Sequence, residues 1–230
     1  MGAPRRVSNA PPEGIPVPEG SAPGETPGAP PPPKPRTPRD PAPGRVYRTT
    51  MSPAPAPRLL ADGTVLRPAT PDDARPLAEA LARSRASMRP WEPDRPDAFY
   101  TPEGQADRLT AQLAEGRTVP WILTEGAAVI GGLTLSNLVL GPFRSASLGY
   151  WTDVTRTGRG LATAAVAEVC RAARDDLGLH RVEAGTLLTN AASQRVLAKN
   201  GFEEIGIAPH YLHIDGEWRD HRLFQRILHR

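Results

Sequence analysis

The sequence predicts an α/β fold over residues 58–230. Strand-like and helix-like segments alternate there in the order βααβββαβαββ, and a Gly-Arg-Gly turn at residues 158–160 joins an apolar strand-like run to an alanine-rich helical run. Residues 1–57 hold 18 of the 28 prolines and no periodic apolar positions, so they cannot bury enough surface to offset the entropy of ordering. We therefore expect one folded domain behind a disordered, proline-rich segment.

The charge distribution supports this boundary. Residues 1–57 carry seven Lys or Arg and four Asp or Glu, while residues 58–230 carry 21 of each, so the net charge of +3 belongs to the first segment. A nucleic-acid-binding domain would normally carry the positive charge itself, and we expect no nucleic-acid partner. Met51 stands just before the folded region and could be the true start of translation.

Other classes of protein are disfavoured by what the chain lacks. It has no run of 18 apolar residues and no apolar signal-peptide core, so we expect no membrane span, no secretion and a cytoplasmic location. We expect a monomer or a homodimer. The single cysteine, Cys170, lies on an apolar helical stripe and is expected to be a packed core thiol. The five histidines show no zinc-ligand spacing, and no metal is predicted.

The first half of the domain is expected to hold one strand and two helices. The strand covers residues 64–68, and Thr70-Pro71-Asp72-Asp73 then supplies an N-cap, a proline at the first helical position and acids in the first turn of a helix to about Arg83. Thr101-Pro102-Glu103 begins a second helix, which runs to about residue 115. The loop between them, residues 88–94, is too rich in proline for regular structure.

The second half is expected to be mostly strand. Turn signals at Gly126 and Gly141-Pro142 separate three strands, and Asn190 caps a helix that Asn200-Gly201 ends. The expected strands cover residues 119–124, 128–138, 146–151, 181–187, 202–213 and 221–228, and the expected helices cover residues 160–176 and 191–199.

The turn at residues 158–163 predicts a binding site for a pyrophosphate. A strand that passes through Gly-x-Gly into a helix leaves backbone N–H groups unpaired at the positive end of the helix dipole. No Lys-Ser or Lys-Thr pair follows the glycines, which excludes the nucleoside-triphosphate P-loop. Thr163 stands where the dinucleotide fingerprint requires a third small residue, so that pattern fails as well.

Five segments in sequence order resemble the GNAT superfamily of acetyl-CoA-dependent N-acetyltransferases. Three are general to the superfamily, and two are similar to the subgroup that contains the ribosomal-protein alanine N-acetyltransferases. The general segments are residues 148–151, 158–163 and 190–202, and the subgroup segments are residues 90–93 and 211–221. The resemblance departs at Thr155, where the family usually has Gln or Arg. It implies a mixed sheet with helices on both faces, splayed open after Trp151 so that the pantetheine arm of CoA pairs with free backbone there.

The resemblance also implies which residues bind acetyl-CoA, the expected co-substrate. The pyrophosphate is expected on the Gly-Arg-Gly turn and the pantetheine beside the preceding strand and Asn190. The residues expected to bind the cofactor are Tyr150, Trp151, Thr152, Val154, Gly158, Arg159, Gly160, Leu161, Ala162, Thr163 and Asn190.

Acetyl transfer requires a base, because an amine attacks a thioester only as the free base. Glu183 is the first candidate, since a spacing of seven residues before Asn190 aims it at the cleft if the strand is regular. Glu183 could instead only pair with Arg181 or Arg195. Glu92 is the second candidate, in the loop that would border the acceptor.

The departing CoA thiolate benefits from a proton donor. The resemblance assigns this task to Ser193, three residues after Asn190 and on nearly the same helix face. A leaving thiol has a pKa of about 8.5, so the donor is helpful rather than indispensable. In the simpler interpretation, Asn190 only caps its helix and Ser193 bonds back to the first turn.

The acceptor amine is the least determined part of the reaction. Acidic residues near the expected acceptor side favour a cationic amine, and Trp91, Tyr211 and Trp218 are expected to wall its pocket beside Glu92. The acidic residues are Glu92, Asp94, Asp97, Asp215, Glu217 and Asp220. The resemblance favours a protein N-terminal amine; a small-molecule amine, or a catalytically silent acyl-CoA-binding module, remains as an alternative.

Overall fold

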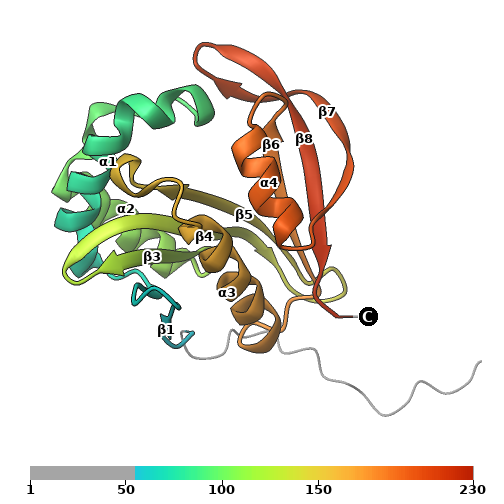
Figure 1. Ribbon diagram of the computed structural model, residues 1–230, viewed down its shortest axis with the longest axis horizontal. Coiled ribbons are helices and arrows are strands. Elements are labelled where there is room, and N and C mark those ends of the chain that lie inside the picture. Colours follow the sequence, from blue (N-terminus) through green and yellow to red (C-terminus); the bar gives the residue numbers. More distant parts are fainter. Residues whose placement is uncertain (1–54, 230) are drawn as a thin grey trace, which may run out of the picture. The chain divides into compact units, whose positions relative to one another are not determined.

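One mixed sheet of eight strands, in the order β1-β2-β3-β4-β5-β6-β8-β7, organises the described part of the chain (Figure 1). The computed structural model describes residues 55–229, so the segment expected to be disordered lies outside the described residues except for its last three. The strands are β1 (Arg58–Leu59), β2 (Val65–Pro68), β3 (Val119–Glu125), β4 (Ala128–Val139), β5 (Ser145–Thr152), β6 (Arg181–Leu187), β7 (Glu203–Ile214) and β8 (Glu217–Ile227). The predicted α/β class is confirmed, and the two-residue strand β1 is an addition to it.

Helices α2 and α4 begin where the capping signals predict, whereas Pro71 begins a 3₁₀ turn and α1 follows only at Ala74. Thr101 accepts a hydrogen bond from the Gly104 N–H at 3.1 Å, and Asn190 accepts one from the Ser193 N–H at 3.0 Å. The α-helices are α1 (Ala74–Met88), α2 (Pro102–Glu115), α3 (Leu161–Asp175) and α4 (Ala191–Lys199), and the 3₁₀ turns are η1 (Pro71–Asp73), η2 (Arg89–Trp91), η3 (Asp97–Tyr100) and η4 (Val154–Arg156). No helix in the described residues is long and apolar enough to span a bilayer.

Two elements extend four or more residues beyond their predicted bounds. Helix α1 continues past Arg83 because buried positions recur at helical spacing through Leu81, Ser84 and Met88. Strand β8 begins at Glu217 rather than at residue 221, because Asp215 and Gly216, with φ of 48° and 79°, close a two-residue hairpin turn.

Helices cover both faces of the sheet and create two hydrophobic clusters. Alternate residues of β3 point to opposite faces, so Ile122 joins the cluster under α1 and α2, while Trp121 and Leu123 join the cluster under α3 and α4. Cys170 is buried in the second cluster, as predicted. The sheet is thus fixed from both sides.

The sheet opens between β5 and β6, its one parallel pair. Only Ser145, Ala146 and Ser147 pair with β6, opposite Arg181, Val182 and Glu183, and beyond them the two strands diverge (Figure 1). The splayed sheet is therefore as predicted. The expected opening point after Trp151 is wrong, since the strands part already at Leu148.

Candidate active site

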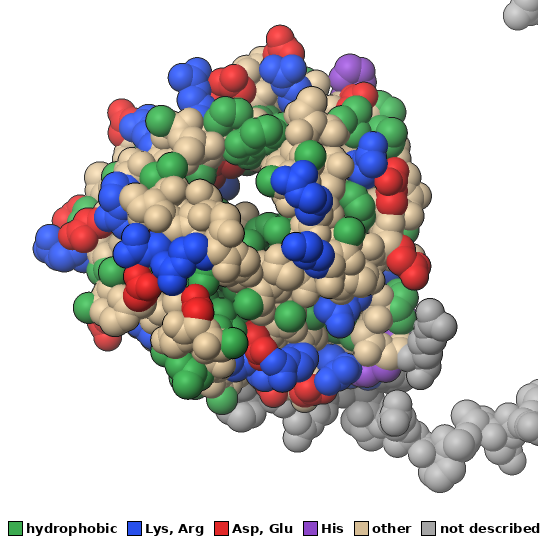
Figure 2. Space-filling view, viewed as in Figure 1, with side chains coloured by type: hydrophobic (Ala, Val, Ile, Leu, Met, Phe, Trp, Pro, Cys, Tyr) green, Lys and Arg blue, Asp and Glu red, His purple; other side chains and the backbone are tan. Residues whose placement is uncertain are grey.

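A cavity of about 990 Å³ lies between the parted strands. Because β5 and β6 separate, the cavity connects the two faces of the sheet, and Figure 2 shows an opening through the middle of the molecule. One end is lined by the turn at residues 157–163 and by α4. The other end is lined by α1, α2 and the η2 segment.

The Gly-Arg-Gly turn has the backbone geometry that the sequence predicts. Gly158 and Gly160 have φ of 78° and 79°, where a side chain is disfavoured, although a Cβ at either would meet no atom within 4 Å. Within the described residues, no N–H group of residues 158–163 donates to a protein acceptor. These groups stand at the N-terminus of α3 and can receive an anion.

All but one of the predicted cofactor-binding residues line the cavity. The lining residues are Tyr150, Trp151, Thr152, Val154, Gly158, Gly160, Leu161, Ala162, Thr163 and Asn190. The exception is Arg159, whose guanidinium lies 3.4 Å from the Glu125 carboxylate and 3.7 Å from that of Asp62. Its ion pairs hold the side chain outside the lining.

Thr155, where the sequence departs from the family pattern, donates hydrogen bonds to the buried carboxylate of Asp153. Its N–H and hydroxyl donate to Asp153 at 2.9 and 2.8 Å, and Arg83 of α1 donates to the same carboxylate at 2.5 Å. Burial raises the pKa of Asp153, but these hydrogen bonds outweigh it, so that the pKa lies below its usual value. The Val154 N–H donates to Ser84 of α1 at 3.2 Å, so α1 anchors the start of the turn.

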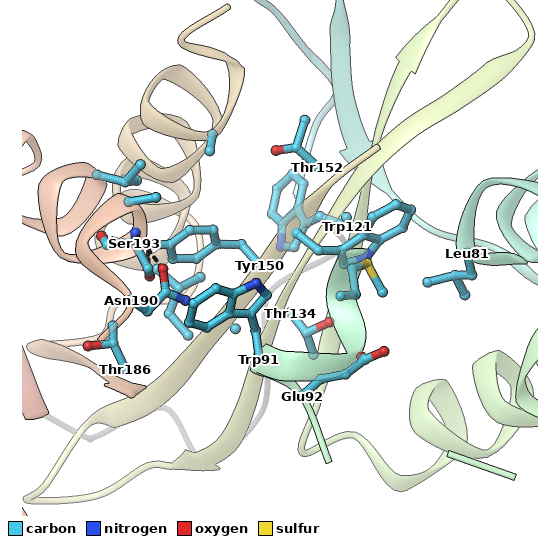
Figure 3. A pocket seen from close by; sticks show the side chains of 18 of the residues that line it. Leu81, Trp91, Glu92, Trp121, Thr134, Tyr150, Thr152, Thr186, Asn190 and Ser193 are labelled. Atoms are coloured by element: carbon cyan, nitrogen blue, oxygen red, sulfur yellow. Dashed lines mark hydrogen bonds between the residues drawn. The ribbon is translucent and has the colours of Figure 1, made fainter. Parts of the chain in front are cut away.

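A polar cluster forms where β5 faces α4. The Tyr150 hydroxyl lies 2.7 Å from the Ser193 hydroxyl and donates to the Ser193 carbonyl at 3.1 Å (Figure 3). Burial raises the pKa of Tyr150 to about 12. Asn190 does cap α4, as the simpler interpretation holds, yet its NH₂ group has no hydrogen-bond partner among the described residues and it lines the cavity. The two interpretations of Asn190 are compatible.

Glu92 is the carboxylate at the cavity. Its Oε1 is buried without a hydrogen-bond partner in the described residues, and Arg95 lies 4.0 Å from its other oxygen. Burial raises the pKa of Glu92, against the lowering influence of Arg95 and the Tyr100 hydroxyl. Figure 3 shows Glu92 across the opening from Asn190 and Ser193, with the ring of Trp91 between them.

Glu183 does not reach the cavity. It pairs with Arg181 at 3.4 Å and lies in the closed part of the sheet, opposite Ser147. By strand alternation Glu183 shares a face with Gly185 and Leu187, which do line the cavity, so its position along β6, where the strand is still paired with β5, keeps it out of the lining.

Two predicted acceptor residues also lie outside the lining. Tyr211 is exposed and its ring packs against His221 at 5.3 Å, while Trp218 is exposed and packs against His213 at 5.7 Å. Both belong to the long β7–β8 hairpin, and only Trp91 and Glu92 of the predicted acceptor set line the cavity.

The acceptor end is less acidic than expected. Glu92 is the only one of the six expected acidic residues in the lining, where Arg95 and Arg108 join it. Sequence reasoning missed Arg108, and it missed His221, which is buried and lines the cavity opposite Leu187. Arg108 lies in no motif, whereas His221 is the last residue of the subgroup segment 211–221 and could have been identified from it.

Three residues that line the cavity have a buried polar atom without a protein partner in the described part of the chain. Glu92 Oε1, Thr186 Oγ1 and Trp121 Nε1 are buried and lack a hydrogen bond in the described residues, and all three residues line the cavity. Buried polar groups are normally satisfied, so unpartnered ones around a cavity are typical of a ligand-binding site.

Comparison with known proteins agrees with this geometry. A family model described as "Acetyltransferase (GNAT) domain" matches residues 64–203. The chain is 34% identical over 182 residues to the [Ribosomal protein uS5]-alanine N-acetyltransferase of Escherichia coli K12, covering 77% of this chain and 92% of that protein. It is 32% identical to the Probable N-acetyltransferase YjcK of Bacillus subtilis, covering 69% of this chain and 90% of that protein.

Solved structures show the same fold. Ribosomal-protein-S5-alanine acetyltransferase from Vibrio fischeri superposes with a TM-score of 0.71 at 30% identity, covering 75% of this chain and 97% of that one. Mycobacterium smegmatis RimJ in complex with CoA-disulfide superposes with a TM-score of 0.68 at 34% identity, covering 71% and 81%. The chain belongs to the GNAT family of acetyltransferases and is an N-acyltransferase.

Proposed function

We propose that this protein transfers the acetyl group of acetyl-CoA to the N-terminal amine of a protein. The observation that carries the proposal is the continuous cavity, which joins the free N–H groups of residues 158–163 to the unpaired carboxylate oxygen of Glu92. A thioester donor and an amine can therefore enter from opposite faces of the sheet and meet between β5 and β6. The relatives named as uS5-alanine N-acetyltransferases support a protein amine as the acceptor.

Acetyl-CoA would be held mainly by backbone groups. The N–H groups at the start of α3 would receive the pyrophosphate, and the parted edges of β5 and β6 would receive the pantetheine arm. Arg195 and Lys199 line the same end and form no ion pair within the described residues, so they add positive charge for the phosphates. The NH₂ group of Asn190 is free to bind a carbonyl oxygen of the arm.

Glu92 is the proposed general base. The attacking nitrogen forms a bond to the thioester carbonyl carbon and loses a proton to the carboxylate, directly or through one water molecule. The raised pKa of Glu92 brings its proton affinity closer to that of the amine. Glu183, which pairs with Arg181 outside the cavity, is not proposed for this role.

Ser193 and Tyr150 are the proposed proton donors. When the C–S bond breaks, the sulfur carries the negative charge and the Ser193 hydroxyl can supply a proton. Tyr150 stays protonated at neutral pH because burial raises its pKa to about 12. Its 2.7 Å contact with the Ser193 hydroxyl lets it pass its proton to the serine oxygen, and the phenolate then takes a proton back from solvent.

The test is acetyl transfer to peptides by the purified full chain. Peptides that begin with Ala or Ser are incubated with acetyl-CoA, and both thiol release and the mass of the peptide are followed. We expect stoichiometric thiol release and addition of one acetyl group at the α-amine, and no reaction with the same peptides blocked at the N-terminus. CoA binding by calorimetry with no acetylated peptide from any sequence would refute the proposed acceptor.

A further inference from the structure

An arginine without a carboxylate partner lies at the acceptor end of the cavity. Arg108 projects from α2 and its guanidinium carbon lies 5.4 Å from the centre of the Phe99 ring. Within the described residues no carboxylate lies within 4 Å of Arg108, whereas Arg95, which also lines the cavity, lies 4.0 Å from the Glu92 carboxylate. Burial lowers the pKa of Arg108 to about 10, with a smaller influence from the charge of Arg95, so the group remains protonated at neutral pH.

Two glutamines hold this guanidinium in place. Its Nε and Nη2 donate to Gln105 Oε1 at 2.9 and 2.7 Å, and its Nη1 donates to Gln112 Oε1 at 3.2 Å. Gln105 is fully buried, and its NH₂ group donates to the Phe99 carbonyl, which leaves its oxygen directed at Arg108. The position of Arg108 is therefore set before any acceptor binds.

The hydrogen bonds of Arg108 are incomplete. An arginine side chain has five N–H donors, and the described residues accept from three of them. One N–H on each terminal nitrogen remains, and a carboxylate can accept from both. A largely buried cation with free donors is costly unless an anion pairs with it.

The same end of the cavity carries charges of both signs. Glu92 presents a free carboxylate oxygen, and Arg95 adds a second guanidinium beside it. This arrangement is complementary to a molecule that carries a primary amine and, close to it, a negative group.

We propose that Arg108 selects acceptors with a carboxylate close behind the reacting amine, namely protein N-termini with an acidic side chain in the first few residues. The inference rests on the proposed function and adds the class of sequence that is acetylated. The carboxylate of a free amino acid has the same chemistry. We favour a peptide, because the cavity opens through the molecule (Figure 2) and so leaves room for a continuing chain.

The experiment compares matched peptides with the full-length protein and acetyl-CoA. In each pair, Glu replaces Gln at position two, three or four behind an N-terminal Ser, and kcat/KM is measured for both. We expect one Glu position to raise kcat/KM about ten-fold, the usual effect of one charge-assisted hydrogen bond. In Arg108→Gln the two peptides of a pair should have equal kcat/KM. In Arg108→Lys, which keeps the charge, the Glu peptide should keep part of its advantage.

Arg75→Gln is the control variant. Arg75 is exposed on α1 outside the cavity, and its substitution removes the same charge. It should keep the wild-type ratio, and calorimetry with CoA verifies that each variant is folded. Equal kcat/KM for Glu and Gln peptides at all three positions would overturn the inference while leaving peptide acetylation intact. Faster acetylation of free Ser than of every peptide would overturn it in favour of amino acid acceptors. Absence of any peptide product would reject the proposed function itself, and the inference with it.

Discussion

At the scale of single residues, the Tyr150–Ser193 contact unites two positions that the sequence assigned to different tasks. Ser193 was expected to donate a proton and Tyr150 to bind the cofactor. Their hydroxyls lie 2.7 Å apart, and the tyrosine pKa of about 12 keeps it protonated across the range in which the amine reacts. A serine hydroxyl alone is a poor acid. The hydrogen bond from Tyr150 explains how Ser193 can nevertheless donate a proton.

We predict that Ser193→Ala and Tyr150→Phe each lower kcat and leave the KM for acetyl-CoA nearly unchanged. The loss should be roughly ten- to hundred-fold, at the low end for general acid catalysis, because a thiolate is a moderate leaving group without protonation. The double variant should be no slower than the slower single variant, since the two hydroxyls act as one unit. Steady-state kinetics on the four proteins measures this. Losses that multiply in the double variant would contradict a shared role.

Glu92 should control the acidic limb of the pH profile. Burial raises its pKa, and a base works only when deprotonated, so kcat/KM should fall as the pH falls through that raised value. Glu92→Gln should lower kcat/KM about a hundred-fold or more and remove this limb, leaving only the limb of the acceptor amine. The Arg95 and Tyr100 side chains face Glu92 and remain in place in this variant.

The matched control for Glu92 is Glu183→Gln, which removes a carboxylate outside the cavity and should keep the wild-type profile. A Glu183 variant that loses activity as the Glu92 variant does would reverse the assignment. The sequence could not separate the two, because it does not show how far β6 stays paired with β5, and Glu183 lies within the paired part.

At the scale of elements, the Gly-Arg-Gly turn depends on backbone conformation more than on space. A Cβ at Gly158 would contact nothing, yet its φ of 78° disfavours any side chain. We predict that Gly158→Ala costs about 1–3 kcal/mol of folding free energy if the turn is kept. It should also weaken CoA binding, because relaxation of the strain redirects the N–H groups.

Gly63→Ala is the control for Gly158→Ala. Gly63 has a similar φ of 85°, equally open surroundings and a position outside the cavity. It should show a comparable loss in thermal unfolding and an unchanged CoA affinity by calorimetry. Equal CoA affinity in both variants would show that the turn does not bind the pyrophosphate.

Elements with local signals could be predicted, and those that depend on distant contacts could not. The caps at Thr101 and Asn190 and the period of each strand are properties of a few neighbouring residues, and the structure reproduces them. The point at which β5 leaves β6 has no such signal, because it depends on how many pairs two distant segments form. Arg108 was missed for the same reason, since its partners Gln105 and Gln112 are ordinary residues of one helix.

At the scale of the whole molecule, the cavity belongs entirely to the folded domain. All residues that line it fall between Ala69 and His221. We therefore predict that a chain beginning at Met51 keeps its acetylation rate and CoA affinity within about two-fold of the full chain. The comparison needs only the two purified proteins and one peptide. A large loss of activity would assign residues 1–50 a part in the site or in substrate capture.

The parting of β5 and β6 leaves backbone amides unpaired along the gap between the two parts of the sheet. In β5 and β6, alternate amides point to the paired neighbours β4 and β8, and the others point into the gap beyond Ser147 and Glu183. A pantetheine arm in the gap would accept from those amides and bridge the halves. We therefore predict that CoA slows hydrogen exchange at residues 148–152 and 184–187 as well as at residues 158–163.

Adenosine diphosphate separates the two contributions to this protection, because it has the pyrophosphate and lacks the pantetheine arm. It should protect residues 158–163 and leave both strand edges exchanging as in the free protein. Strand β1, far from the cavity in the sheet order, should not respond to either ligand. If CoA protected only the turn, the gap would not be the pantetheine site, and the thioester would have to reach Ser193 and Glu92 by another path.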